Sequence, residues 1–136
     1  IDGNIGRHPK NRQLFTVLNA DGRDSITQYK LYKYLPPLSY VKLYPKTGRT
    51  HQLRVHLNSI GHPIFCDNSY GGGSKNAKSF HIKYTQIINC LLKAINRVAL
   101  HANMIKICHP ETMVEMEFKA PLPKDFQRAL EILNDG

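Results

Sequence analysis

The sequence has 136 residues, of which 41% are hydrophobic, so it excludes a disordered chain and fits one domain with a single core. It carries 19 Lys and Arg residues against 10 Asp and Glu residues, a formal net charge of +9, and Asp67 is the only acid between Ser25 and Pro110. This basic excess predicts a polyanionic partner, with nucleic acid ahead of an anionic membrane. The alternative is a basic soluble protein without such a partner.

No run of residues approaches the roughly 20 apolar residues of a membrane span. The start has no basic segment followed by an apolar one, so we predict no signal peptide and no membrane partner. Cys66, Cys90 and Cys108 are odd in number and widely spaced, which indicates free thiols in a reducing compartment. We therefore expect a cytoplasmic protein, or an organelle-matrix protein in a eukaryote. Because the first residue is Ile1 and not methionine, we expect a piece of a longer protein.

The first 44 residues indicate strands joined by turns. Residues 1–12 are expected to form an ordered loop or a strand edge, and residues 13–18 a short strand. An Asp-Gly pair within residues 19–24 is a strong hairpin signal. Residues 25–34 and 39–44 are predicted strands, because β-branched and aromatic residues or an alternation of apolar and polar residues dominate them. From the first of these two strands, the side chains expected to pack are Ile26, Tyr29, Leu31 and Tyr32.

Residues 50–60 carry the pattern of a short helix. Thr50 is placed to cap its N-terminus, and Gly61 is placed to end it. The apolar stripe that should anchor this helix consists of Leu53, Leu57 and Ile60. Arg54 lies on the adjoining face, so the helix should hold this cation rigidly. Residues 63–65 are predicted to form a short strand after the helix.

The second half of the chain mixes strands and helices. Residues 69–79 have the composition of a flexible loop. Apolar residues at helical spacing predict a helix within residues 80–96. Strands are expected at residues 98–108 and 113–118, and an amphipathic helix at residues 125–133. We therefore predict an α+β fold, with a mainly antiparallel mixed sheet and short helices.

Other kinds of site fit the sequence less well. His51 and His56 lie five residues apart on the predicted helix and diverge by about 140°, so they cannot share a metal ion, and we predict no metal site. The glycine-rich residues 71–75 lack the pattern of a phosphate-binding loop. A Cys–His nucleophilic pair stays open, although each cysteine lies in an apolar run that is typical of core packing. We interpret Asp67 as a turn cap in preference to a catalytic carboxylate.

Tyrosines and lysines are interleaved along residues 29–44. The tyrosines could offer stacking platforms for RNA on one face of a sheet, or they could pack into the core, and both interpretations stay open. The residues concerned are Tyr29, Lys30, Tyr32, Lys33, Tyr34, Tyr40, Lys42 and Tyr44.

One long motif carries a family resemblance. The string T-G-R-T-H-Q-L-R-V-H-L-x-x-I-G-H-P-I-x-x-D-x-x-Y-G, from Thr47 to Gly71, closely resembles the signature of the RluA-type RNA pseudouridine synthases. The same resemblance continues in I-D-G-x-I-G-R-H-P at residues 1–9, A-L-H-A at 99–102, H-P-E-T at 109–112 and A-P-L-P-x-D-F at 120–126. The order and spacing of these motifs agree with the family over nearly the whole chain.

The resemblance implies that residues 1–136 are the C-terminal portion of one catalytic domain, with residues 69–96 as a variable loop and helix insertion. Such enzymes isomerise uridine to pseudouridine in ribosomal or transfer RNA, after flipping the nucleotide out of its stack, through a catalytic aspartate. They use no metal and no cofactor. Arg54 corresponds to the arginine that forms a salt bridge with that aspartate, so we expect it to be catalytic. The residues expected to contact RNA around it are Arg7, Arg49, His51, Gln52 and His56.

The chain also departs from the family pattern. The nucleophile of the family lies in an Arg-Leu-Asp motif upstream of residue 1, and no Arg-Leu-Asp occurs in this sequence. We therefore expect the chain alone to be inactive, and the alternative is a noncatalytic RNA-binding relic of the same fold. Cys66 and Met113 stand where the family usually or frequently has glycine, and residues 71–95 look longer than the usual connection.

Overall fold

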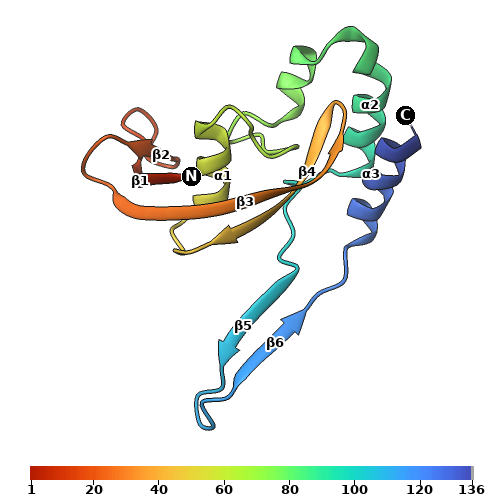
Figure 1. The fold of residues 1–136 in the computed structure, drawn as a ribbon. Coiled ribbons are helices and arrows are strands. Elements are labelled where there is room, and N and C mark those ends of the chain that lie inside the picture. Colours follow the sequence, from red (N-terminus) through yellow and green to blue (C-terminus); the bar gives the residue numbers. More distant parts are fainter. Residues whose placement is uncertain (136) are drawn as a thin grey trace.

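Four antiparallel strands form the larger sheet of the computed structural model, which describes residues 1–135 (Figure 1). They are β1 (Asp2–Arg7), β2 (Phe15–Leu18), β3 (Arg23–Leu35) and β4 (Leu38–Pro45), in the spatial order β2-β1-β3-β4. The first residues of β3 pair with β1, and its remaining length pairs with β4. The strands predicted within residues 13–44 are therefore confirmed, and the segment expected as a loop or strand edge is a full strand.

The hairpin predicted at the Asp-Gly pair is wrong. Asp21 does turn the chain, with φ of 65°, but β2 and β3 are not paired, because β1 lies between them. Two glycines make room for this arrangement. A Cβ on Gly3 would lie 2.9 Å from Val17 Cγ1, and one on Gly6 would lie 2.5 Å from Leu18 Cδ1. The Asp-Gly signal thus identifies the turn and not the strand partner.

The face of β3 that turns inward is polar. Ser25 and Thr27 are fully buried, whereas Ile26, Tyr29, Leu31 and Tyr32 are each at least 40% exposed. The prediction that these four side chains pack into the core is therefore wrong. Helix α1 (Gln52–Ser59) covers the buried face, and the Gln52 amide donates 3.0 Å hydrogen bonds to the Ile26 carbonyl and to Thr27 Oγ1. Burial of these polar groups is tolerated because they find partners there.

Helix α1 differs from its prediction at its start and on its buried face. It begins two residues after Thr50, and the capping position belongs to His51, whose φ is 55° and whose side chain makes no capping hydrogen bond. It ends as predicted before Gly61, which has φ of 76°. The buried residues are Gln52, Val55, His56 and Leu57, so only Leu57 of the predicted stripe is deeply buried. Polar residues of α1 are buried because β3 offers them hydrogen-bond partners: Gln52 and His56 both bond to Thr27 Oγ1.

Two antiparallel helices cover the other end of the molecule. They are α2 (Thr85–Ala94), preceded by the 3-10 helices η1 (Ser74–Ser79) and η2 (Ile82–Tyr84), and α3 (Lys124–Asp135), and α2 and α3 lie side by side (Figure 1). Their shared core consists of Cys66, Ile88, Leu91, Ile95 and Ala129. The helical periodicities predicted for both segments are confirmed. Residues 69–79, expected as a flexible loop, contain η1 and several turns.

A two-stranded hairpin of β5 (Met104–Cys108) and β6 (Glu115–Lys119) extends away from the rest of the fold (Figure 1). Lys106 lies 3.3 Å from Glu115 and 3.4 Å from Glu117, so both acids lie on one face of the hairpin. Strand structure at residues 98–103 and 63–65 is absent, so those parts of the prediction are wrong. The backbone there is held by isolated contacts, such as the Ala99 N–H to the Phe65 carbonyl at 2.9 Å.

The predicted α+β class is confirmed, and in residues 1–135 every strand pairing is antiparallel. All three cysteines are free, but only Cys66 is buried. Core packing is therefore wrong for Cys90 and Cys108, because both lie on outward faces of their elements. Over the same residues, no helix combines the length and apolar character needed to cross a membrane.

Candidate functional site

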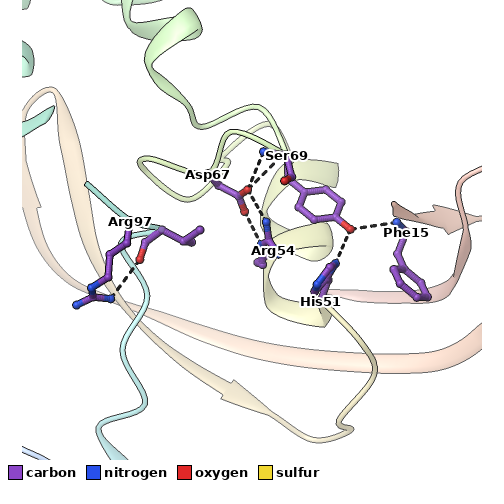
Figure 2. Close-up of polar contacts among 8 residues, drawn as sticks. Phe15, His51, Arg54, Asp67, Ser69 and Arg97 are labelled. Atoms are coloured by element: carbon purple, nitrogen blue, oxygen red, sulfur yellow. Dashed lines mark hydrogen bonds and ion pairs between the residues drawn. The ribbon is translucent and has the colours of Figure 1, made fainter. Parts of the chain in front are cut away.

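A buried ion pair joins α1 to the turn that follows it. Arg54 Nε lies 2.7 Å from Asp67 Oδ2, and Arg54 Nη2 lies 2.8 Å from Asp67 Oδ1 (Figure 2). The Asp67 side chain is 0% exposed and that of Arg54 is 20% exposed. Asp67 Oδ1 also accepts the backbone N–H groups of Ser69 at 3.1 Å and Tyr70 at 3.2 Å. The predicted turn cap is confirmed, and the ion pair is an addition that sequence reasoning missed.

Both members of this pair are charged at neutral pH. Burial by itself would raise the pKa of Asp67, but the hydrogen bonds and charge of Arg54 and the two backbone amides outweigh it, so the pKa lies below its ordinary value. The hydrogen bond to Asp67 raises the pKa of Arg54. The pairing uses Nε and Nη2 of the guanidinium. Among residues 1–135, no side chain or carbonyl accepts from Nη1, so its two N–H groups can bind a second anion.

Tyr70 packs against one face of the Arg54 guanidinium and links Arg54 to the sheet. The Arg54 guanidinium lies 4.7 Å from the centre of the Tyr70 ring, a cation–π contact. The Tyr70 hydroxyl accepts the Phe15 N–H at 3.0 Å and lies 2.8 Å from His51 Nδ1 (Figure 2). Burial, followed by the charge of Arg54, lowers the pKa of His51. His51 is therefore mostly neutral at pH 7, and its Nδ1 and the Tyr70 hydroxyl share one hydrogen bond.

The same contacts continue to the edge of the sheet. The rings of His51 and Phe15 meet edge to face with centroids 5.7 Å apart, and the Arg7 guanidinium lies 4.4 Å from the Phe15 centroid. We call the series Arg7, Phe15, His51, Tyr70 and Arg54 the cation–aromatic row. The row has a cation at each end and edge-to-face rings between them, and these contacts hold both cations in position.

A cavity of about 360 Å³ lies beside Arg54. Its walls are mostly apolar, and they consist of Leu53, Arg54, Val98, Leu100, His101 and Ala102. The fold thus brings the A-L-H-A motif of residues 99–102 against α1. Arg97 fixes this wall, because its Nη1 donates to the Leu100 carbonyl at 2.9 Å (Figure 2). Its Nε and Nη2 bind Asp125 at 2.8 and 3.0 Å. An apolar cavity with a few fixed polar groups suits a small planar ligand.

The predicted site residues separate into accessible and buried groups. Arg7, Arg49 and His51 are exposed. Gln52 is 4% exposed and His56 is 0% exposed, so their side chains lie beneath the surface and support the site from the inside. Gln52 Oε1 accepts the Arg49 backbone N–H at 2.9 Å, and His56 Nδ1 lies 2.9 Å from Thr27 Oγ1. Within residues 1–135, no cluster of three or more His, Cys, Asp and Glu side chains could hold a metal ion.

The tyrosines of β3 and β4 are mostly exposed, and they lie on both faces of the sheet, because Tyr29 pairs with Leu43, the neighbour of Tyr44 on β4. Of these five tyrosines, four are exposed, namely Tyr29, Tyr32, Tyr34 and Tyr44. Tyr40 is half-buried and packs against Tyr32 and Phe126, with centroids 5.1 and 6.0 Å away. Lys42 Nζ lies 4.5 Å from the Tyr32 ring centre. Of the two open interpretations, core packing therefore holds only for Tyr40.

Sequence reasoning also missed Tyr70 and Phe15. Tyr70 belongs to the recognised motif, three residues after Asp67, and its position there is the signal that could have identified it. Phe15 carries no such signal, because it lies in a short apolar strand where a core role is the ordinary expectation.

His56 should make stability depend on pH. Burial lowers the pKa of His56, so the unfolded chain binds the proton more readily than the folded one. The resulting stability is present above the unfolded value of about 6.5 and is lost as pH falls through the folded pKa, with each unit of lowering worth about 1.4 kcal/mol. We expect the free energy of unfolding in urea to fall between pH 7.5 and pH 5 on a scale of about 1.4 kcal/mol per unit, and to fall less steeply in His56→Asn. Equal slopes for both proteins would contradict the assignment to His56.

Comparison with known proteins agrees with this arrangement. The family described as RNA pseudouridylate synthase matches residues 1–59. An uncharacterized RNA pseudouridine synthase of Chlorobaculum parvum is 39% identical over 134 residues, which cover 96% of this chain and 41% of that protein. The ribosomal large subunit pseudouridine synthase D of Vibrio cholerae is 38% identical over 125 residues (92% and 37%), and that of Escherichia coli K12 is 34% identical over 133 residues (98% and 39%).

A solved structure shares the fold. It is described as human RNA pseudouridylate synthase domain containing 4 and superposes with a TM-score of 0.58 at 22% identity, covering 98% of this chain and 55% of that one. The chain thus spans about two fifths of the length of the curated relatives, with 37% to 41% of each covered. From the matched family and from relatives aligned along nearly all of its length, the chain belongs to the RNA pseudouridylate synthase family.

Proposed function

We propose that this chain forms part of the catalytic domain of an RNA pseudouridine synthase that isomerises uridine in ribosomal RNA. The observation that carries the proposal is the setting of Arg54. Asp67 holds one edge of its guanidinium, Tyr70 supports one face, and Nη1 stays available at the wall of an apolar cavity. The names of the Vibrio cholerae and Escherichia coli relatives support ribosomal RNA as the substrate, and transfer RNA is the second candidate.

In this proposal the cavity beside Arg54 receives the flipped uracil base. Leu53, Val98 and Leu100 supply apolar surface that replaces the base stack, which offsets part of the cost of flipping. The reaction breaks the N1–C1′ bond, rotates the base and joins C5 to C1′, while a proton leaves C5 and another binds N1. Substrate and product are isomers, so the balance needs no co-reactant, and we propose no metal or cofactor.

The role of Arg54 is electrostatic. Its Nη1 would bind the nucleophilic carboxylate, and its charge would keep that carboxylate ionised in a partly dry cavity. Asp67 already occupies the other edge, so the two carboxylates lie on different edges of one planar cation. The sequence has no Arg-Leu-Asp, so we propose that residues of the intact protein outside this chain supply the nucleophile.

Release of tritium from RNA labelled at C5 of uridine tests the proposal, because C5 loses its hydrogen only when the new bond forms. We expect the intact protein to release tritium from ribosomal RNA. We expect the 136-residue chain, shown to be folded by circular dichroism, to release none. Release by the chain alone would contradict an external nucleophile. RNA binding without release by the intact protein would overturn the catalytic proposal in favour of a noncatalytic RNA-binding protein.

A further inference from the structure

A second and larger cavity lies at the opposite end of the cation–aromatic row. Its volume is about 480 Å³, and residues from four separate segments line it. The lining groups that decide its chemistry are Arg7, Phe15, Asp21, Arg23, Gly48 and Arg49. Three cations against one acid give the cavity a formal charge of +2, counted over these lining residues. No element of the proposed reaction uses this cavity.

Two of its three guanidinium groups are fixed by the fold. Arg7 stacks on Phe15 at 4.4 Å and donates from Nη1 to the Arg12 carbonyl at 2.8 Å, which leaves its Nε and Nη2 without a partner among residues 1–135. Arg49 donates from Nε to the Asp24 carbonyl at 3.2 Å, which leaves both of its terminal nitrogens without a partner among residues 1–135. The rest of Arg49 is held through its backbone N–H by Gln52, which is itself anchored on β3. These groups therefore lose little further freedom when they bind an anion.

The available donors suit a phosphate. Planar guanidinium groups with free N–H pairs match the oxygens of a phosphate group, and several of them around one cavity give the strongest form of this recognition. Base stacking does not explain the cavity as well, because Arg7 already occupies a face of its only aromatic ring. Through the packed side chains of Phe15, His51 and Tyr70, the cavity is connected to Arg54.

We propose that the cavity formed by Arg7, Arg23 and Arg49 binds a backbone phosphate of the RNA substrate, at a nucleotide that flanks the target uridine. This inference rests on the proposed function for the identity of the strand. The cavity fixes the position of the strand, while the pocket at Arg54 receives the base. Arg23 thereby gains a role that the sequence motif did not suggest.

Two variants probe the cavity from different directions. Arg23→Gln removes a cation whose side chain makes no hydrogen bond within residues 1–135, so the fold should be unaffected. Gly48→Glu adds a carboxylate at the wall, where a Cβ would meet no atom within 4 Å. Arg128→Gln is the matched control, because it removes an exposed arginine on α3 whose only ion-pair partner within residues 1–135 is Glu131.

The measurement is the affinity of the intact protein for a short single-stranded, uridine-containing RNA at several salt concentrations, by fluorescence anisotropy. We expect Arg23→Gln to weaken binding about five- to tenfold and to reduce the slope of log K against log salt by about 0.7, the value of one single-strand phosphate contact. Gly48→Glu should weaken binding further, and Arg128→Gln should change neither quantity. A loss in Arg128→Gln equal to that in Arg23→Gln would overturn the proposal, because the effect would then be one of net charge alone.

Other arms identify the source of the phosphate. Arg23→Gln should weaken binding of single-stranded DNA of the same sequence by the same factor as binding of RNA. A loss of affinity confined to RNA would contradict a phosphate contact. Displacement of RNA by inorganic phosphate at concentrations too low to screen charge would reassign the cavity to a small phosphate ligand. In tritium release, Arg23→Gln should raise KM and leave kcat nearly unchanged. If the intact protein released no tritium at all, the proposed function would fail, while affinity and salt slope would still decide the cavity.

Discussion

Replacing Asp67 with alanine is expected to lower the free energy of unfolding by about 3–5 kcal/mol, the usual cost of removing one partner from a buried ion pair. The carboxylate is 0% exposed, so the variant leaves a cavity, and the Arg54 guanidinium loses two hydrogen bonds. The backbone N–H groups of Ser69 and Tyr70 lose their acceptor as well. Urea unfolding followed by circular dichroism measures the change.

Two further variants separate the causes. Asp67→Asn keeps an oxygen for Ser69 and Tyr70 but loses the charge, so it should retain part of the stability that Asp67→Ala loses. Asp125→Asn is the matched control, because Arg97 and Asp125 form the same two-bonded geometry with side chains 41% and 28% exposed. Solvent screens that pair, and its loss should cost much less. Equal costs for Asp67→Asn and Asp125→Asn would contradict the importance of burial at Asp67.

Replacing Arg54 in the intact protein is expected to lower kcat by about 10²–10³, the range found when one preorganised electrostatic donor is removed from an active site. RNA affinity should change only a few-fold, because Arg7 at the other end of the cation–aromatic row and the remaining basic residues of the chain are unchanged. Tritium release and fluorescence anisotropy measure the two effects separately. Near-full turnover by Arg54→Ala would exclude the role that we propose.

Stability must be controlled in this experiment, because Arg54→Ala leaves the buried Asp67 without its cation. Arg54→Lys keeps a positive charge near Asp67 and should preserve most of the fold. A lysine has one nitrogen and cannot bind two carboxylates on two edges of a planar group, so its turnover should still fall steeply. A fully active Arg54→Lys would show that charge alone is enough at this position.

Local patterns predicted much of this molecule. The apolar spacing that indicates α2 and α3 places Ile88, Leu91 and Ala129 in one core. The helical pattern of residues 50–60 predicted Arg54 as a rigidly held cation, and the structure holds it through Asp67 and Tyr70. Asp67 was assigned only its local role, because its contacts with Ser69 and Tyr70 follow from turn chemistry. Its pairing with Arg54, 13 residues away, depends on how the chain returns past α1, and no periodicity encodes that path.

Two departures from the family pattern have a conformational explanation. Cys66 has φ of 63° and Met113 has φ of 55°, in the left-handed region that glycine adopts with little steric cost. The family resemblance puts glycine at these positions. Glycine suits them because of the positive φ of the backbone and not because a side chain would lack space. Holding a non-glycine residue there costs about 1–2 kcal/mol. At position 66 the buried side chain offsets part of that cost, because Cys66 packs in the core shared by α2 and α3.

The polar inner face of β3 determines how this strand can be aligned. Apolar strands are kept in register by burying every second side chain, but here the buried positions are Ser25 and Thr27 and the exposed one between them is Ile26. A shift of one residue would place isoleucine against the Gln52 amide and leave Thr27 and His56 without each other, at about 1–3 kcal/mol for each buried group left unsatisfied. Hydrogen bonds of these buried polar groups therefore fix the register of β3. Hydrophobic alternation applied to residues 25–27 alone would instead turn Ile26 inward.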